Sequence, residues 1–102
     1  MNQGKFNKII DINFMKTKDS GKVVARADVH FEGFILKGFK ILRDSETNRE
    51  YVTPPSYFAP NKGWRPIFKT DSREDWQEIT NRILNDFNKH LMKQVMEENY
   101  DE

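Results

Sequence analysis

The chain has 102 residues, the usual length of one compact domain, so a two-domain enzyme with a cleft between its lobes is not expected. It contains no cysteine, which excludes disulfides, thiolate metal sites and a cysteine nucleophile. Charged residues make up 32% of the chain, the formal net charge is +1 and the mean hydropathy is -0.86, a composition that argues against a membrane protein. The sequence lacks both an apolar signal segment and a run approaching the roughly 18 apolar residues of a spanning helix, so we expect a soluble, cytoplasmic domain.

The N-terminal third predicts two strands joined by a turn. Residues 5–15 alternate loosely, and one side carries Phe6, Ile10, Ile12 and Phe14. Residues 18–21 (Lys-Asp-Ser-Gly) then supply turn chemistry. Residues 23–32 alternate strictly, which places five apolar side chains on the core face of a second strand: Val23, Ala25, Ala27, Val29 and Phe31. The two segments are expected to pair as a hairpin.

Three further strands are predicted between residues 34 and 69. The alternation of residues 34–42 is imperfect, and Gly38 marks a bulge there. A short strand at residues 50–53 is stopped by Pro54 and Pro55, because proline cannot donate to a strand ladder. Residues 56–63 are expected to form a loop that ends in a turn. Residues 64–69 follow as a last short strand at a sheet edge, since Pro66 interrupts them.

The last third predicts one long amphipathic helix. Two capping boxes are available at its start, Asp71 with Glu74 or Ser72 with Asp75. At 100° per residue six apolar side chains gather on one face: Trp76, Ile79, Ile83, Leu84, Phe87 and Leu91. This face is expected to pack on the core.

These elements predict one α+β domain spanning residues 1–102. An antiparallel sheet of about five strands occupies residues 5–69 and is followed by the helix at about residues 72–96. The acidic residues 97–102 form a tail that is expected to fray.

Residues with catalytic or metal-binding chemistry are sparse. The two histidines, His30 and His90, lack the spacing of a catalytic triad or a metal site, and a structural role is expected for each. Asp28 and Glu32 share a strand face, where a catalytic acid pair is a weak alternative to two solvated carboxylates. No glycine-rich phosphate motif is present. We therefore expect no enzymatic activity, no metal and no cofactor.

Charge is distributed unevenly along the chain. Residues 1–70 carry 13 Lys or Arg and 7 acids, a formal charge of +6, whereas residues 71–102 carry 4 bases and 9 acids, a charge of −5. A basic body suits a polyanionic partner, although an ordinary solvated surface produces the same imbalance.

Aromatic residues are followed by basic ones at three places in the basic region: Phe39-Lys40, Trp64-Arg65 and Phe68-Lys69. Such pairs can grip a nucleic-acid backbone while a ring stacks on a base. The expected phosphate contacts are Lys62, Arg65, Lys69 and Arg73. The alternative is that Trp64 and Phe68 are core residues whose charged neighbours point to water.

Several motifs occur in an order that is characteristic as a set. They are ARADVHF at residues 25–31, FILKGFKI at 34–41, YVTPPS at 51–56, Gly-Trp-Arg at 63–65 and the apolar stripe of the helix. With these motifs most of the chain resembles the SpoVG family (stage V sporulation protein G, septation regulator), in which a strand runs into a Pro-Ser pair.

The resemblance implies a small α+β dimer, without enzymatic activity, that binds DNA and RNA and influences gene expression and cell division in bacteria. It supports Arg65 and Arg73 as contact residues. The family commonly has basic residues directly after Pro-Ser, where this chain has Tyr57 and Phe58, so binding through this segment is either lost or shifted from charge to stacking.

Two functions follow, with nucleic-acid binding first. The leading hypothesis is a dimeric regulatory protein that binds DNA, RNA or both and affects gene expression or septation. The alternative is a non-catalytic protein-interaction module, which would use Tyr57, Phe58, Met92 and Met96 as exposed contacts for a protein partner. Met92 and Met96 lie off the helix stripe and are the expected dimer contacts, unless the dimer forms by pairing of sheet edges.

Overall fold

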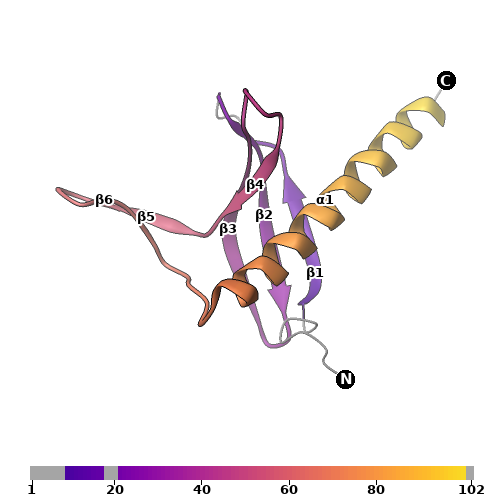
Figure 1. The fold of residues 1–102 in the computed structure, drawn as a ribbon. Coiled ribbons are helices and arrows are strands. Elements are labelled where there is room, and N and C mark those ends of the chain that lie inside the picture. The colour runs from indigo at the N-terminus through magenta and orange to yellow at the C-terminus, as the bar shows by residue number, and fades with distance from the viewer. Residues whose placement is uncertain (1–8, 18–20, 101–102) are drawn as a thin grey trace.

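The computed structural model describes residues 9–17 and 21–100, with side chains up to residue 96. Six strands precede one helix, in the order β1 (Ile9–Met15), β2 (Val23–Phe31), β3 (Phe34–Arg43), β4 (Glu50–Thr53), β5 (Ser56–Ala59), β6 (Gly63–Pro66) and α1 (Arg73–Tyr100) (Figure 1). The predicted α+β class, an antiparallel sheet followed by a long C-terminal helix, is confirmed. Residues 5–8 of the first predicted strand, residues 18–20 of the predicted turn and residues 101–102 of the tail lie outside the described residues.

The strands form two separate antiparallel sheets. The main sheet has the order β1-β2-β3-β4, and β5 pairs only with β6. Two predictions are therefore wrong: residues 56–59 are a strand, not a loop, and the strand that follows joins them in a hairpin instead of extending the main sheet. The physical reason is Pro54-Pro55, which ends the ladder of β4 and lets the chain turn away before pairing resumes.

One face of the main sheet forms the core with α1. Ala25, Ala27, Val29 and Phe31 of β2 are buried as predicted. They pack with Phe39 and Ile41 of β3, Val52 of β4 and the buried residues of the helix: Ile79, Ile83 and Phe87. Trp76, Leu84 and Leu91 pack half-buried at the border of this cluster, so the predicted helix stripe is confirmed.

Two predicted core residues point elsewhere because bulges shift the alternation of their strands. Ile10 is exposed, since the pairing of β1 with β2 shifts between Ile9 and Asp11, and Ile9 is buried in its place. Val23 lies on the opposite face of the sheet from Ala25 because the pairing of β2 with β3 shifts between these two residues.

The bulge predicted at Gly38 is confirmed. Ala27 pairs with Phe39 but Val29 pairs with Leu36, so β3 contains one extra residue at this point. Gly38 has φ of 104°, which a residue with a side chain adopts only under strain, and its N–H donates to Asp28 Oδ1 over 3.3 Å. The positive φ of Gly38 and the hydrogen bond from its N–H to Asp28 thus accommodate the extra residue of the bulge.

The helix starts in the second of the two predicted capping registers. Ser72 Oγ accepts a hydrogen bond from the Asp75 N–H over 3.1 Å, so Ser72 is the N-cap and α1 begins at Arg73.

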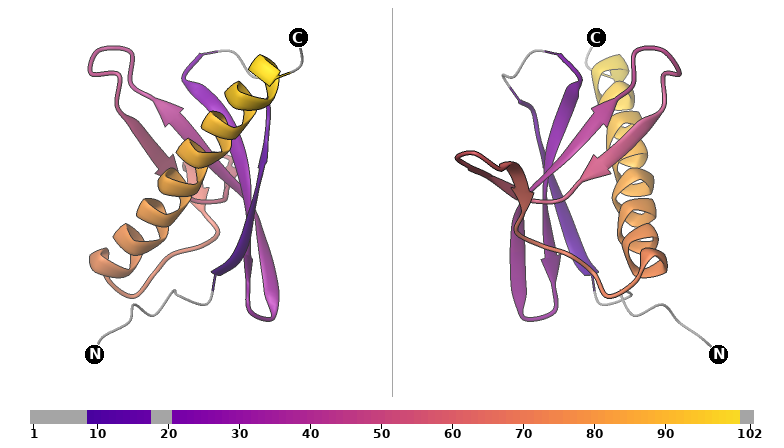
Figure 2. Two further views of the ribbon diagram at one scale, coloured as in Figure 1. Left: turned by 90° about the vertical axis from the view of Figure 1, so that its right-hand side faces the viewer. Right: turned by 60° about the vertical axis from the view of Figure 1, so that its left-hand side comes forward.

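The helix continues to Tyr100, four residues beyond its predicted end, so residues 97–100 of the predicted tail are helical. Figure 2 shows α1 crossing one face of the main sheet and extending past it. No helix among the described residues is both long and apolar enough to cross a membrane.

Candidate nucleic-acid interface

The β5–β6 hairpin projects from the domain, away from the C-terminal end of α1 (Figure 1). Its turn follows from the sequence Ala59-Pro60-Asn61-Lys62. The Lys62 N–H donates to the Ala59 carbonyl oxygen over 3.0 Å, proline supplies the fixed first central position, and Asn61 adopts φ of 70° at the second. At the base of the hairpin the Ile67 N–H donates to the Pro55 carbonyl oxygen over 2.7 Å.

The hairpin exposes three aromatic rings. The exposed fractions are 52% for Tyr57, 59% for Phe58 and 66% for Trp64. Phe58 and Trp64 are cross-strand partners with ring centroids 5.6 Å apart, and Tyr57 pairs with Arg65 on the other face of the hairpin. The alternative interpretation of Trp64 as a core residue is therefore wrong.

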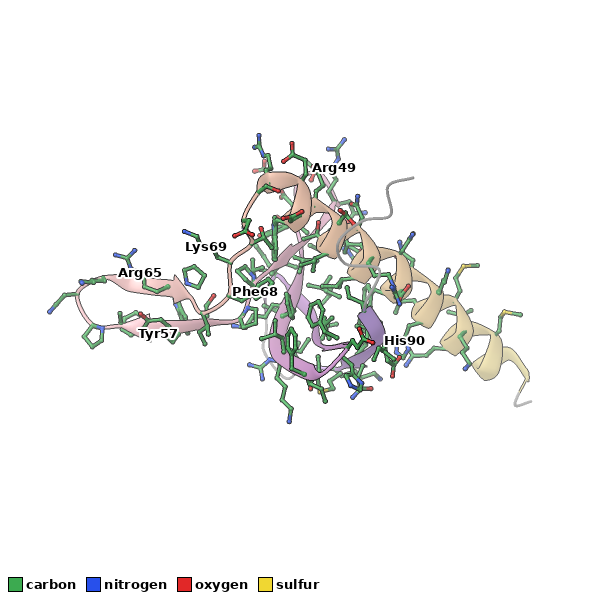
Figure 3. The ribbon with its side chains drawn as sticks, turned by 90° about the horizontal axis from the view of Figure 1, so that it is seen from below. Arg49, Tyr57, Arg65, Phe68, Lys69 and His90 are labelled. Atoms are coloured by element: carbon green, nitrogen blue, oxygen red, sulfur yellow. The ribbon has the colours of Figure 1, made fainter. Side chains whose placement is uncertain are left out.

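All four predicted phosphate contacts have exposed side chains. Lys62 lies at the hairpin turn, Arg65 in β6, Lys69 in the segment after β6 and Arg73 in the first turn of α1. None of the four forms an ion pair with another described residue. Arg65 and Lys69 point to the same side of the hairpin in Figure 3. The cations are thus spread along one continuous segment and do not converge on a single point.

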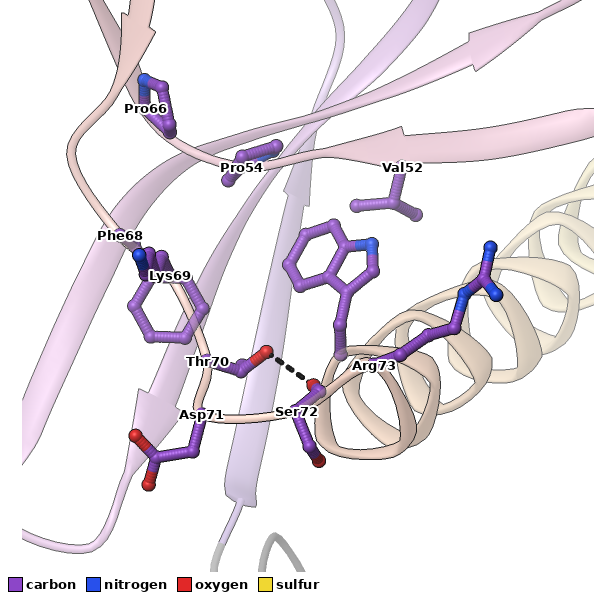
Figure 4. A pocket seen from close by; sticks show the side chains of 10 residues that line it. Val52, Pro54, Pro66, Phe68, Lys69, Thr70, Asp71, Ser72 and Arg73 are labelled. Atoms are coloured by element: carbon purple, nitrogen blue, oxygen red, sulfur yellow. Dashed lines mark hydrogen bonds between the residues drawn. The ribbon is translucent and has the colours of Figure 1, made fainter.

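Two of these cations, Lys69 and Arg73, line a shallow cavity of about 440 Å³ at the start of α1. Its apolar lining includes Val52, Phe68 and Trp76. Figure 4 shows the Asp71 carboxylate and the Arg73 guanidinium pointing in opposite directions, and these two described side chains form no ion pair.

Phe68 is a second member of the aromatic-basic pairs with a core role, beside the buried Phe39. It is half-buried, and its ring centroid lies 5.7 Å from that of the fully buried Phe39, edge to face. Trp76 stacks on the same Phe39 ring with a centroid distance of 6.4 Å. The core interpretation therefore holds for Phe68 and fails for Trp64, although both residues precede a basic side chain.

A second basic surface was not predicted. It is a groove of about 550 Å³ between the main sheet and the hairpin, on the side of the sheet opposite the core. Arg26, Lys37 and Lys40 line it together with Trp64, and the Lys40 ammonium lies 5.4 Å from the Trp64 ring centroid. The sequence carried a partial signal for this groove, because Lys40 belongs to one of the aromatic-basic pairs and Arg26 alternates with core residues.

The C-terminal part of α1 carries apolar side chains that face solvent. Met92 is 67% exposed, Val95 55% and Met96 61%, beyond the last helix residue that packs on the core, Leu91. Met92 and Met96 thus lie off the core stripe, as predicted.

The two histidines lie on different elements. His90 packs its ring against that of Phe14 with a centroid distance of 5.3 Å, and His30 is half-buried on β2. Among the side chains that the structure describes, in residues 9–17 and 21–96, no three from His, Cys, Asp or Glu gather as metal ligands would.

Comparison with protein families and with curated proteins gives no match for this chain.

Proposed function

We propose that this protein binds nucleic acid and acts as a cytoplasmic, non-enzymatic regulatory protein of the SpoVG type. The observation that carries the proposal is the projecting hairpin, which exposes three aromatic rings beside Lys62 and Arg65. Three exposed aromatic rings on one small element favour a binding surface, and rings interleaved with cations can hold an unpaired nucleic-acid strand.

Lys62, Arg65, Lys69 and Arg73 supply the contacts to phosphates. Each is exposed, so neutralising a phosphate releases counterions without breaking an ion pair with another described residue. The first-turn acids Glu74 and Asp75 oppose an anion on the helix axis, so we expect the phosphates to lie toward Lys69 and Arg73.

Salt dependence tests this function. With four phosphate contacts, the logarithm of the association constant for duplex DNA is expected to fall with the logarithm of salt concentration with a slope of about −3.6. Replacing any one of the four cations with Gln is expected to reduce the slope by about 0.9, to a similar extent on every sequence. Fluorescence anisotropy of a labelled duplex over a salt series measures both.

The matched controls are Lys89→Gln and Lys93→Gln, which remove exposed cations from the far half of α1. They are expected to leave the slope unchanged. If these variants reduce the slope and the four proposed contacts do not, the outer face of α1 is the binding surface and the assignment is wrong.

We further propose that the protein is a homodimer. Met92, Val95 and Met96 form an exposed apolar strip on α1 that a second copy would cover. Light scattering is expected to give about twice the monomer mass of 12.2 kDa, and replacing both Met92 and Met96 with Glu to shift it toward the monomer. A monomer that persists at high protein concentration refutes the dimer. If the double variant is still a dimer, the interface is assigned to an edge strand of the main sheet, β1 or β4.

The second candidate function is a protein-interaction module. The exposure of Tyr57, Phe58, Met92 and Met96 favours it, because these are adaptable apolar contacts on two separate elements. The same salt series separates the two functions: an absent or salt-independent response to DNA and RNA supports the protein partner.

A further inference from the structure

The groove between the main sheet and the hairpin has the composition of a binding site. One wall is the outer face of β2 and β3, and the other is formed by Pro54, Pro55 and Ile67 at the base of the hairpin, with Trp64 above them in β6. Its volume of about 550 Å³ is within the range of small-ligand sites.

The Gly38 bulge is what brings two of the groove lysines together. Side chains three positions apart in a regular strand point to opposite faces. Because β3 has one extra residue at the bulge, Lys37 and Lys40 both line the groove while Leu36 and Phe39 both face the core. Arg26 pairs with Lys40 across the ladder and adds the third cation.

The groove is electropositive. Arg26, Lys37 and Lys40 line it, no acidic side chain is among its described lining residues, and none of the three cations forms an ion pair with another described residue. The nearest acid on this face of β2, Asp28, accepts the Gly38 N–H, so its carboxylate has a backbone partner. Like charges placed side by side on a sheet destabilise it unless an anion lies between them.

Trp64 adds a flat apolar surface to these charges. It is 66% exposed, and the Lys40 ammonium lies 5.4 Å from its ring centroid. A base stacked on this ring would hold its own phosphate within reach of Lys40. A base in a duplex cannot do so, because both of its faces are covered by its stacked neighbours.

We propose that this groove binds single-stranded nucleic acid, with an unpaired base stacked on Trp64 and the backbone phosphates on Arg26, Lys37 and Lys40. The inference rests on the proposed function and adds to it a ligand class, an unpaired segment of DNA or RNA. Its phosphates lie on Arg26, Lys37 and Lys40 and not on the duplex contacts Lys62, Arg65, Lys69 and Arg73, and Trp64 of the hairpin supplies the stacking ring.

The test compares three ligands of the same sequence: a 12-nucleotide DNA strand, the matching RNA strand and the DNA duplex. The triple variant Arg26→Gln, Lys37→Gln, Lys40→Gln is expected to reduce the salt slope for single strands by about 2.1 and to leave the duplex slope unchanged. Trp64→Ala is expected to weaken single-strand binding about 5- to 150-fold, and Trp64→Phe, which keeps a ring, much less.

Two matched controls keep the result specific. Lys16→Gln, Lys89→Gln and Lys93→Gln together change the net charge as much as the groove variant does, using exposed residues outside the groove. Tyr51→Ala removes an exposed ring from β4, outside the hairpin and the groove lining. Both are expected to leave single-strand affinity within about twofold of the parent, and circular dichroism confirms that each variant is folded.

The outcomes separate the two proposals. If the parent binds the duplex, and if the groove variant and Trp64→Ala bind single strands as tightly as the parent does, the groove proposal alone is overturned. Equal loss of duplex and single-strand affinity in the groove variant also overturns it, because the groove would then be part of one general phosphate surface. No binding of any of the three ligands overturns the proposed function itself. Tighter binding of the RNA strand than of the DNA strand identifies single-stranded RNA as the preferred ligand, and the reverse identifies single-stranded DNA.

Discussion

Replacing Phe39 with alanine is expected to lower the free energy of unfolding by about 4 kcal/mol. Phe39 is fully buried, and its ring contacts both Phe68 and Trp76, so truncation leaves a cavity between the sheet, the segment after the hairpin and the first turns of α1. Urea denaturation followed by circular dichroism measures the change.

Ile35→Val serves as the control, because Ile35 is 51% exposed and its truncation is expected to change the free energy of unfolding by no more than about 0.5 kcal/mol. A loss below 1 kcal/mol for the Phe39 variant would show that Phe68 and Trp76 close the space by themselves. The cluster of the three rings Phe39, Phe68 and Trp76 would then not be what holds the start of α1 against the sheet.

Removing all four proposed phosphate contacts is expected to have the largest effect on binding. Replacing Lys62, Arg65, Lys69 and Arg73 with Gln lowers the formal net charge from +1 to −3. At about 0.1 M salt, four lost contacts are expected to reduce the affinity for duplex DNA by roughly three orders of magnitude and to bring the salt slope close to zero. Anisotropy titrations at several salt concentrations measure both quantities.

A second quadruple variant isolates position from net charge. Replacing Lys16, Arg49, Lys89 and Lys93 with Gln gives the same net charge, but these exposed residues follow β1, lie between β3 and β4 or lie on α1, outside both the hairpin and the groove lining. It is expected to keep nearly the full slope. If both variants lose the same affinity, binding depends on overall charge and no defined interface exists at the hairpin.

The elements that were predicted well are those in which apolar residues recur at one regular spacing without interruption. Most of β2 and the apolar stripe of α1 were predicted correctly, because strict alternation and 100° spacing each leave one consistent buried face. Ser72 and Arg73 at the helix start followed from capping chemistry, although the sequence offered a second register at Asp71.

The misplaced core residues have one physical cause in common, the strand bulges. A single extra residue turns every following side chain to the other face, and alternation by itself does not show where that residue lies. Ile10 and Val23 were misplaced for this reason. The bulge at Gly38 was predicted correctly, because glycine tolerates positive φ and a glycine within a strand therefore indicates a bulge.

The candidate site was predicted only in part for a related reason. The four cations near the hairpin and the helix start are close in sequence, so charge and aromatic neighbours were enough to select them. The groove joins Arg26, Lys37 and Lys40 to Trp64, which is distant in the chain. Its existence depends on the phase of β3 and on the direction in which the hairpin leaves Pro54-Pro55, and neither is contained in a local sequence pattern.

The separate pairing of β5 with β6 has a thermodynamic consequence. A two-stranded ribbon is at best marginally stable in water, whereas β2 is paired on both sides and packed under α1. The hairpin is therefore a unit of local unfolding that can open without loss of the core. A ligand that contacts both the hairpin and the main sheet binds only the form in which β5 and β6 are paired, so by mass action it stabilises the hairpin. Its observed affinity is lower than its affinity for this paired form, because part of the binding free energy is used to keep the hairpin folded.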